Sequence, residues 1–140
     1  MANYKLRQFV TDRAYGCEYC MSQEKFSSQS FSLEHIFPKI LGGTDDLDNL
    51  ALACQGCNNF KFTKIKVIDK ETNTEVFLFN PRMNSWQDHF KWNSNFTVII
   101  ALTPIGRFTV DALQLNRDNL INQRVVYHAF GVHPPSHTTQ

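Results

Sequence analysis

The spacing of apolar and polar residues predicts four short elements in the first half of the chain. Residues 4–14 carry apolar side chains at helical spacing, which predicts an amphipathic helix. Residues 31–36 alternate instead, and Pro38 follows closely, so we expect a short strand that ends before this proline. A second short strand is expected over residues 50–53, and a helix from about residue 58 to 66. The expected order is therefore helix, strand, loop, strand, helix.

The second half predicts mostly strands and one longer helix. The segment Thr103-Pro104-Ile105-Gly106 is typical of a turn between two strands of a hairpin. Asn116 is typical of a residue that caps the start of a helix. The ten residues that follow residue 130 are expected to be irregular. The expected elements are strands over 67–69 and 75–79, hairpin strands over 96–102 and 107–112, and a helix over 117–130.

Length and composition agree with one folded unit. The chain has 140 residues, which corresponds to a single domain spanning residues 1–140. A hydrophobic content of 42% and an aromatic content of 13% are enough for a packed core. The longest apolar run, residues 98–102, is far shorter than the roughly 20 residues of a membrane span, and the N-terminus has no signal-like apolar stretch. We therefore expect a soluble, cytoplasmic protein that does not bind a membrane.

The charge excludes binding of nucleic acid through a field over the whole surface. The net charge is only +1, so a nucleic-acid partner would have to meet a local patch or a metal. One such patch is expected in residues 58–70, where four lysines stand against Asp69 alone. A solvated helix face would have the same composition, so contact with DNA stays one of two interpretations there.

The cysteines form two pairs with the spacing of metal ligands. Each pair has two residues between its cysteines, and no cysteine is left over. Two such turns provide the four thiolates of a tetrahedral structural zinc site. Two disulfides, or a redox pair beside a packing pair, are the alternatives, and both are disfavoured because disulfide scaffolds are shorter and denser in cysteine. The expected ligands of a single structural Zn²⁺ are Cys17, Cys20, Cys54 and Cys57.

Five polar residues within or just after this cysteine framework resemble a known active site. The segments Cys17-x-x-Cys20, LEHIFPKILGG and DNLALACQGCNNFK together resemble the HNH endonucleases. In that family the first strand ends in an acidic residue followed by His, the second begins near an Asn-Leu pair, and the helix carries His or Asn with a Lys one turn later. The residues that match these positions are Glu34, His35, Asn49, Asn58 and Lys61.

The resemblance implies an α+β fold of the ββα-metal class, also called the His-Me finger. Its core would cover about residues 14–66, stapled by the Cys₄ zinc site. The remainder, about residues 67–140, would form a C-terminal extension in which a β-hairpin and a helix pack on the core. Segment NPRMNSWQDHF resembles extensions found in some bacterial HNH proteins.

The resemblance also assigns a role to each of the matching residues. His35 would be the general base, because a neutral imidazole can take a proton from water near pH 7. Glu34 and Asn58 would hold one catalytic Mg²⁺ or Mn²⁺ through oxygen atoms. Asn in place of the family's third His favours Mg²⁺ over transition metals. Asn49 would brace the loop between the strands and so aim His35.

Basic residues beside these positions are candidates for binding the substrate. Lys61 and Lys64 would contact phosphate from the helix, and Arg82 would do so from a loop. Trp86, His89, Phe90 and Trp92 could stack on bases, but an aromatic cluster of this kind is more typical of a core. Three further histidines, His128, His133 and His137, have no ligand spacing and are expected to be incidental.

The expected function is that of a metal-dependent endonuclease that hydrolyses phosphodiester bonds of DNA, most simply double-stranded DNA. One alternative is a zinc-stapled module that binds nucleic acid without cutting it, with Glu34 and His35 serving only packing. Another is a toxin-like nuclease that cleaves RNA.

Overall fold

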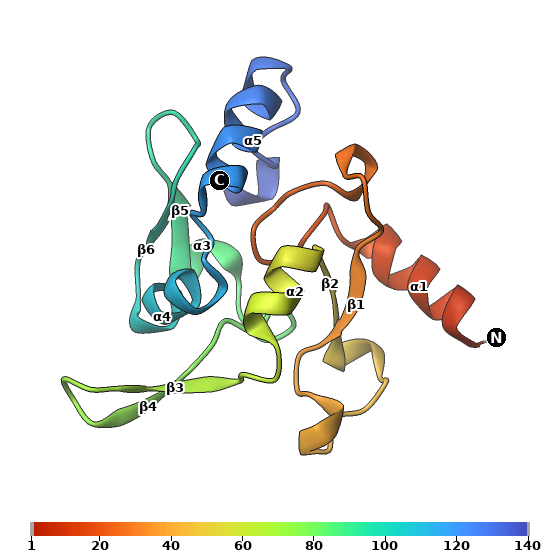
Figure 1. Ribbon diagram of the computed structural model, residues 1–140, viewed down its shortest axis with the longest axis vertical. Coiled ribbons are helices and arrows are strands. Elements are labelled where there is room, and N and C mark those ends of the chain that lie inside the picture. The colour runs from red at the N-terminus through yellow and green to blue at the C-terminus, as the bar shows by residue number, and fades with distance from the viewer. Residues whose placement is uncertain (1, 140) are drawn as a thin grey trace.

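The computed structural model describes residues 2–139 as three small antiparallel sheets surrounded by five α-helices (Figure 1). Each sheet has two strands, and no strand joins two sheets. The mixed α+β class expected from the sequence is thus confirmed. Within residues 2–139, every helix is too short or too polar to cross a lipid bilayer.

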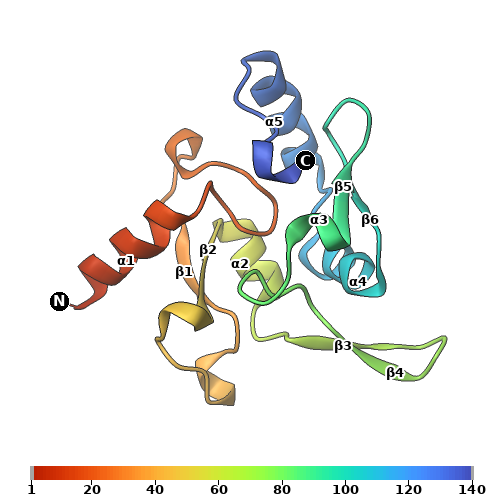
Figure 2. The same ribbon diagram turned by 180° about the vertical axis from the view of Figure 1, so that it is seen from behind.

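The central unit is a hairpin followed by a short helix. Strand β1 (Ser32–His35) pairs with β2 (Leu50–Ala53), and α2 (Gln55–Lys61) follows directly. Helix α1 (Ala2–Arg13) packs against β2, while α4 (Pro104–Leu113) packs against α2, so the unit lies between them (Figures 1 and 2). This is the ββα arrangement expected from the sequence.

Helix α2 is shorter than expected and begins earlier. Its N-cap is Cys54, whose sulfur accepts a hydrogen bond from the Cys57 N–H at 3.3 Å. It ends before Phe62, which takes a positive φ of 51°. Lys64 and Lys66 therefore lie beyond the helix, and the expected helix over residues 58–66 is wrong in its second half.

A projecting hairpin follows α2. Strand β3 (Lys66–Asp69) pairs with β4 (Thr74–Phe77), close to the two strands expected there. The hairpin extends away from the rest of the molecule in both views (Figures 1 and 2). Its base is held by Leu78, whose N–H donates to the Ile65 carbonyl at 2.8 Å.

The expected hairpin over residues 96–112 is wrong in its second strand. Strand β6 (Ile99–Ala101) pairs with β5 (Phe90–Trp92), and the chain then enters α4. Thr103 caps this helix by accepting a hydrogen bond from Gly106 N at 3.0 Å, and Pro104 occupies its first turn. Thr-Pro is as typical of a helix start as of a turn. A Cβ at Gly106 would lie 2.2 Å from the carbonyl oxygen of His89, the residue just before β5, so close packing against this part of the chain requires the glycine.

The expected cap at Asn116 is also wrong. Helix α5 (Asp118–Ala129) starts after Arg117. The Asn116 side chain binds β6 instead: its Oδ1 accepts from Ile99 N at 2.8 Å and its Nδ2 donates to Ile99 O at 2.9 Å. Asn116 therefore fastens the approach to α5 onto the edge of β6.

The aromatic segment forms core and not an exposed stacking surface. Trp86, Phe90 and Trp92 are buried, and the ring centroid of Trp86 lies 5.2 Å from that of Phe90 and 5.3 Å from that of Trp92. The apolar core includes residues from both the central unit and the C-terminal extension. Besides the elements above, the chain forms α3 (Trp86–His89) and four 3₁₀ turns over Glu24–Phe26, Lys39–Leu41, Leu47–Asn49 and Ser136–Thr138.

Candidate active site and metal centre

The four cysteines come together as a buried cluster. Their sulfur atoms all lie within 4.8 Å of one another, and Cys20 Sγ lies 3.7 Å from Cys54 Sγ. All four are free thiols in the structure. Tetrahedral zinc with Zn–S bonds of ~2.3 Å separates its sulfurs by about 3.8 Å, so the cluster has the dimensions of a Cys₄ site.

Local structure explains how the cluster forms. One pair lies in the turn after α1, and the other lies at the N-terminus of α2. The thiols shift one another in opposite directions: hydrogen bonds from the neighbouring thiols, that of Cys17 first, lower the pKa of Cys54, while burial raises the pKa of Cys17. The thiolate is the form that binds a metal. The cysteines are therefore positioned to bind a metal ion, as expected from their spacing.

Glu34 lies inside the ββα unit. Its side chain is only 3% exposed, and Oε1 accepts a hydrogen bond from the hydroxyl of Tyr19. Its Oε2 lies 3.3 Å from Lys61 Nζ, and this ammonium also donates to the Ile36 carbonyl at 2.9 Å. The carboxylate thus occupies the space between β1 and α2.

Lys61 does not lie where the sequence placed it. Its side chain is 2% exposed and points at Glu34, so a direct contact with phosphate does not fit this structure. The helix brings Lys61 to the same side as Asn58, as expected, but that side faces β1. A buried lysine is stable only with a partner, and the partner here is Glu34.

His35 turns away from Glu34 and toward the loop between the strands. Both residues lie within the regular part of β1, so their side chains point to opposite faces. His35 Nε2 lies 2.7 Å from Asp45 Oδ1, and Lys39 Nζ lies 3.2 Å from the same oxygen. The His35 side chain remains 27% exposed, so solvent and solutes can reach it.

Asp45, which lies beside His35 at the exposed end of β1, is a residue that the sequence reasoning missed. Hydrogen bonds from His35 and then Lys39 lower the pKa of its carboxyl group, which is therefore ionised at neutral pH. The available signal was the acidic turn that includes Asp45, Asp46 and Asp48, but sequence does not say which carboxylate meets the imidazole.

Asn49 joins the two ends of the loop. Its Oδ1 accepts from Phe37 N at 2.9 Å, and its Nδ2 donates to the carbonyls of Phe37 and Thr44 at 3.0 and 2.8 Å. These three hydrogen bonds hold the chain on either side of the turn that carries Asp45. The side chain has the contacts of a loop brace.

The other predicted residues are Asn58, Lys64 and Arg82. Asn58 is half-buried, and none of the side-chain hydrogen bonds found among residues 2–139 involves its amide. Lys64 is exposed and donates to the Phe60 carbonyl at 3.1 Å. Arg82 is mostly covered and pairs with Glu18, and burial lowers the pKa of its guanidinium to about 10.

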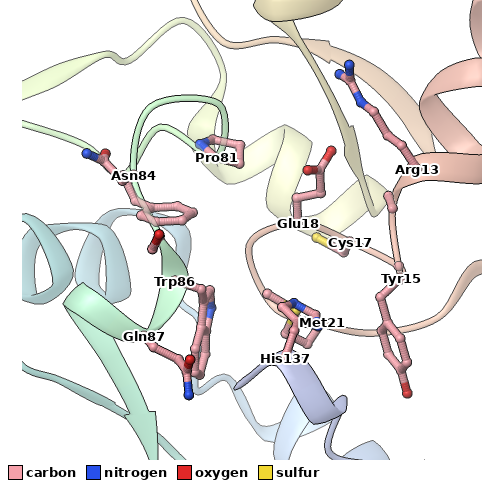
Figure 3. A pocket seen from close by; sticks show the side chains of 14 residues that line it. Arg13, Tyr15, Cys17, Glu18, Met21, Pro81, Asn84, Trp86, Gln87 and His137 are labelled. Carbon is pink, nitrogen blue, oxygen red and sulfur yellow. The ribbon is translucent and has the colours of Figure 1, made fainter. Parts of the chain in front are cut away.

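Two of the hollows beside the ββα unit border candidate residues or the cysteine cluster. An open one of about 540 Å³ is lined by Asn49, Asp48 and Arg82, so Arg82 borders the loop that follows β1. A second, of about 510 Å³, lies beside the first cysteine pair. Figure 3 shows Arg13, Glu18 and Tyr15 on one side of it and Asn84, Trp86 and Gln87 on the other.

Comparison with known proteins supports the same class of protein that the fold and the site indicate. Residues 17–63 match the family model described as HNH endonuclease. The resemblance noted in the sequence is thereby confirmed, and this part of the chain, here called the HNH segment, is an HNH domain of the ββα-metal class. HNH domains act on nucleic acids, so the match indicates a nuclease-type function. The comparisons with curated proteins and with solved structures found no match.

Proposed function

We propose that this protein is a metal-dependent endonuclease that hydrolyses phosphodiester bonds of DNA. The observation that carries the proposal is the exposed edge of the HNH segment, where His35 stands at the end of β1 in contact with the Asp45 carboxylate. Hydrolysis needs an activated water and stabilisation of charge on the phosphoryl and leaving oxygens.

His35 is the proposed general base. An ionised carboxylate can only accept hydrogen bonds, so the ring N–H on Nε2 donates to Asp45 and the neutral imidazole presents Nδ1 as its basic nitrogen. Lys39 holds Asp45 from the other side, and Asn49 braces the loop that carries it. The imidazole is thus oriented before a substrate arrives.

Glu34 and Asn58 are the proposed ligands of one catalytic Mg²⁺ or Mn²⁺. Carboxylate and amide oxygens are donors that these cations prefer. The Asn58 amide is uncommitted to another described side chain, and Glu34 uses two of its roughly four acceptor positions for Tyr19 and Lys61. These donor types suit the cation, but Glu34 is buried, pairs with Lys61 and lies on the face of β1 opposite His35, so the proposal requires Glu34 to leave Lys61 when the cation binds. When bound, such a cation stabilises the developing phosphoryl charge.

A structural Zn²⁺ in the cysteine cluster is the second cofactor that we propose. The four thiolate donors leave no position for a substrate, so this metal would hold the fold and take no part in the reaction. Lys64 and Arg82 remain the proposed contacts to the phosphate backbone. Arg82 would make that contact at the hollow beside Asn49.

The test is cleavage of plasmid DNA by the purified protein with Mg²⁺ or Mn²⁺ and with a chelator. Loss of a general base lowers the rate by about 10²–10⁴-fold, which is the expected effect of His35→Ala. His137→Ala is a matched control, because His137 is an exposed histidine remote in sequence from β1. Equal cleavage by wild type and His35→Ala would contradict the assignment of the base.

The same experiment separates the alternatives from other classes. Tight binding of DNA without cleavage by wild-type protein would favour the zinc-stapled binding module. Cleavage of an RNA substrate offered in parallel, with DNA left intact, would favour the RNA nuclease.

A further inference from the structure

Arg117 reaches the cysteine cluster from a distant part of the chain. It stands immediately before α5, 60 residues after Cys57 and 63 after Cys54. Its Nη2 lies 3.5 Å from Cys54 Sγ and 3.8 Å from Cys57 Sγ, and its Nη1 lies 3.7 Å from Cys57 Sγ. Both ends of the guanidinium fork therefore point at the second cysteine pair.

The contact is complementary in charge. Four thiolates around one Zn²⁺ leave a net charge of about −2 on the centre, and arginine stays protonated at every physiological pH. The other nearby guanidinium, Arg124, is bound to backbone oxygens, including those of Leu115 and Thr97. Among the cationic side chains of residues 2–139, Arg117 is the one that donates hydrogen bonds to sulfur.

The guanidinium is held in place before any metal binds. Nη1 also donates to the carbonyls of Leu113 and Gln114 at 3.1 and 3.2 Å, and the group lies over the Phe60 ring at 5.4 Å. These contacts fix the fork at the end of α4. A hydrogen-bond donor that is already ordered loses little entropy when it meets the thiolates.

The cysteine loop itself has room for this arginine. Gly56 lies between the two cysteines, and a Cβ at this position would lie 2.4 Å from Arg117 Nη2. A side chain there would therefore push the guanidinium away from the sulfurs. The contact between Arg117 and the sulfurs therefore depends on the glycine inside the second C-x-x-C pair.

We infer that Arg117 is a positioning residue of the metal centre: it neutralises the thiolates of Cys54 and Cys57 and thereby makes the C-terminal extension part of the metal site. The inference rests on the proposed structural zinc. Removing hydrogen-bonding partners of metal ligands typically lowers metal affinity by about 10–100-fold. The extension would then be needed for metal retention as well as for packing.

The experiment measures zinc retention by the full-length protein. Purified zinc-loaded protein is challenged with a chromogenic chelator, and Co²⁺-substituted protein is examined for its thiolate-to-metal charge-transfer band. Arg117→Met keeps the apolar stem over Phe60 without charge, while Arg117→Lys keeps a charge without the fork. Arg107→Met is the control, because Arg107 is an exposed arginine of α4 that stacks on Phe108.

We expect Arg117→Met to lose zinc affinity by about 10–100-fold and to shift the charge-transfer band. Arg117→Lys should retain more zinc than Arg117→Met, and Arg107→Met should match wild type. The inference would be overturned if both Arg117 variants retained zinc as wild type does, or if Arg117→Met retained as much zinc as Arg117→Lys or more. Packing alone would then explain the contact.

Gly56→Ala gives a second route to the same answer. It leaves Arg117 in the sequence but displaces its guanidinium, so it should release zinc faster than wild type, and wild-type release would overturn the inference even if Arg117→Met fails to fold. Absence of zinc from the wild-type protein would overturn the zinc assignment itself, whereas cleavage activity is not a readout in this test.

Discussion

Two regions of the molecule face the same problem, because neither the β1–β2 pair nor the β5–β6 pair is large enough to be a stable sheet by itself. The HNH segment (residues 17–63) holds its hairpin and short helix with the cysteine cluster and the buried Glu34–Lys61 pair. The C-terminal extension (residues 67–140) holds its hairpin with buried aromatic rings and with hydrogen bonds such as those of Asn116.

The difference shows how the proposed active site can be exposed and still ordered. In the HNH segment, the interior is fixed by the Glu34–Lys61 ion pair and the buried cysteine cluster, so the edge with His35 and Asp45 is free to face solvent. In the extension, polar side chains such as that of Asn116 instead form hydrogen bonds that join one element to another. Arg117 connects the two regions, because its backbone lies just before α5 in the extension and its guanidinium contacts the cysteines of the HNH segment. Three predictions test this contrast, in order of expected effect.

The largest effect is expected from Cys54→Ser. Structural zinc contributes about 10–16 kcal/mol in small zinc domains, which is as large as the whole stability of about 5–15 kcal/mol of a typical domain. We expect loss of bound zinc and of the cooperative melting transition of the HNH segment, measured by metal analysis and circular dichroism. A chelator should reproduce this in wild-type protein, and His35→Ala should melt like wild type. Unchanged melting of Cys54→Ser would mean that both regions are held by packing alone.

A smaller effect is expected from Lys61→Met. This change leaves the Glu34 carboxylate buried without its cation, which costs about 3–5 kcal/mol. Denaturant unfolding should show that loss, and Glu34→Gln combined with Lys61→Met should recover part of it. Lys64→Met, an exposed lysine three residues further on, should change stability by no more than about 0.5 kcal/mol. Equal effects of the two lysine variants would contradict the burial of Lys61.

The smallest effect is expected from acid on the C-terminal extension. Burial lowers the pKa of His133 from its usual 6.5, and the ring packs edge-on against Trp92 at 4.6 Å near Arg124 and His128. Below pH 6.5 the unfolded chain binds this proton more readily than the folded one, so stability falls as the pH decreases and is constant above that value. Unfolding followed by tryptophan fluorescence at pH 7.5 and 5.5 should show a smaller loss in His133→Gln. An identical loss in both proteins would place the acid sensitivity elsewhere.

Motifs of short range were predictable from the sequence. The two C-x-x-C pairs, the strand that ends before Pro38 and the Asn-Leu pair each depend on residues a few positions apart, so their spacing predicted the ββα unit and the cysteine cluster. The strand over residues 99–101 was also predicted, but its partner was not. Thr103-Pro104 is compatible with a turn and with a helix start, and packing of Gly106 against the His89 carbonyl decides between them.

The sequence by itself therefore determined which residues could do chemistry, because ligand type and spacing are local properties. Only the tertiary structure decided what Lys61 faces, and only it showed that Asp45 and Arg117 meet the candidate residues. Lys61 is of the residue type that contacts phosphate at a surface. Strand β1 places Glu34 opposite it, however, and the ion pair is buried. Asp45 and Arg117 meet His35 and the cysteines across 10 and about 60 residues of chain. Such partnerships depend on how separate elements pack, and no local pattern in the chain carries that information.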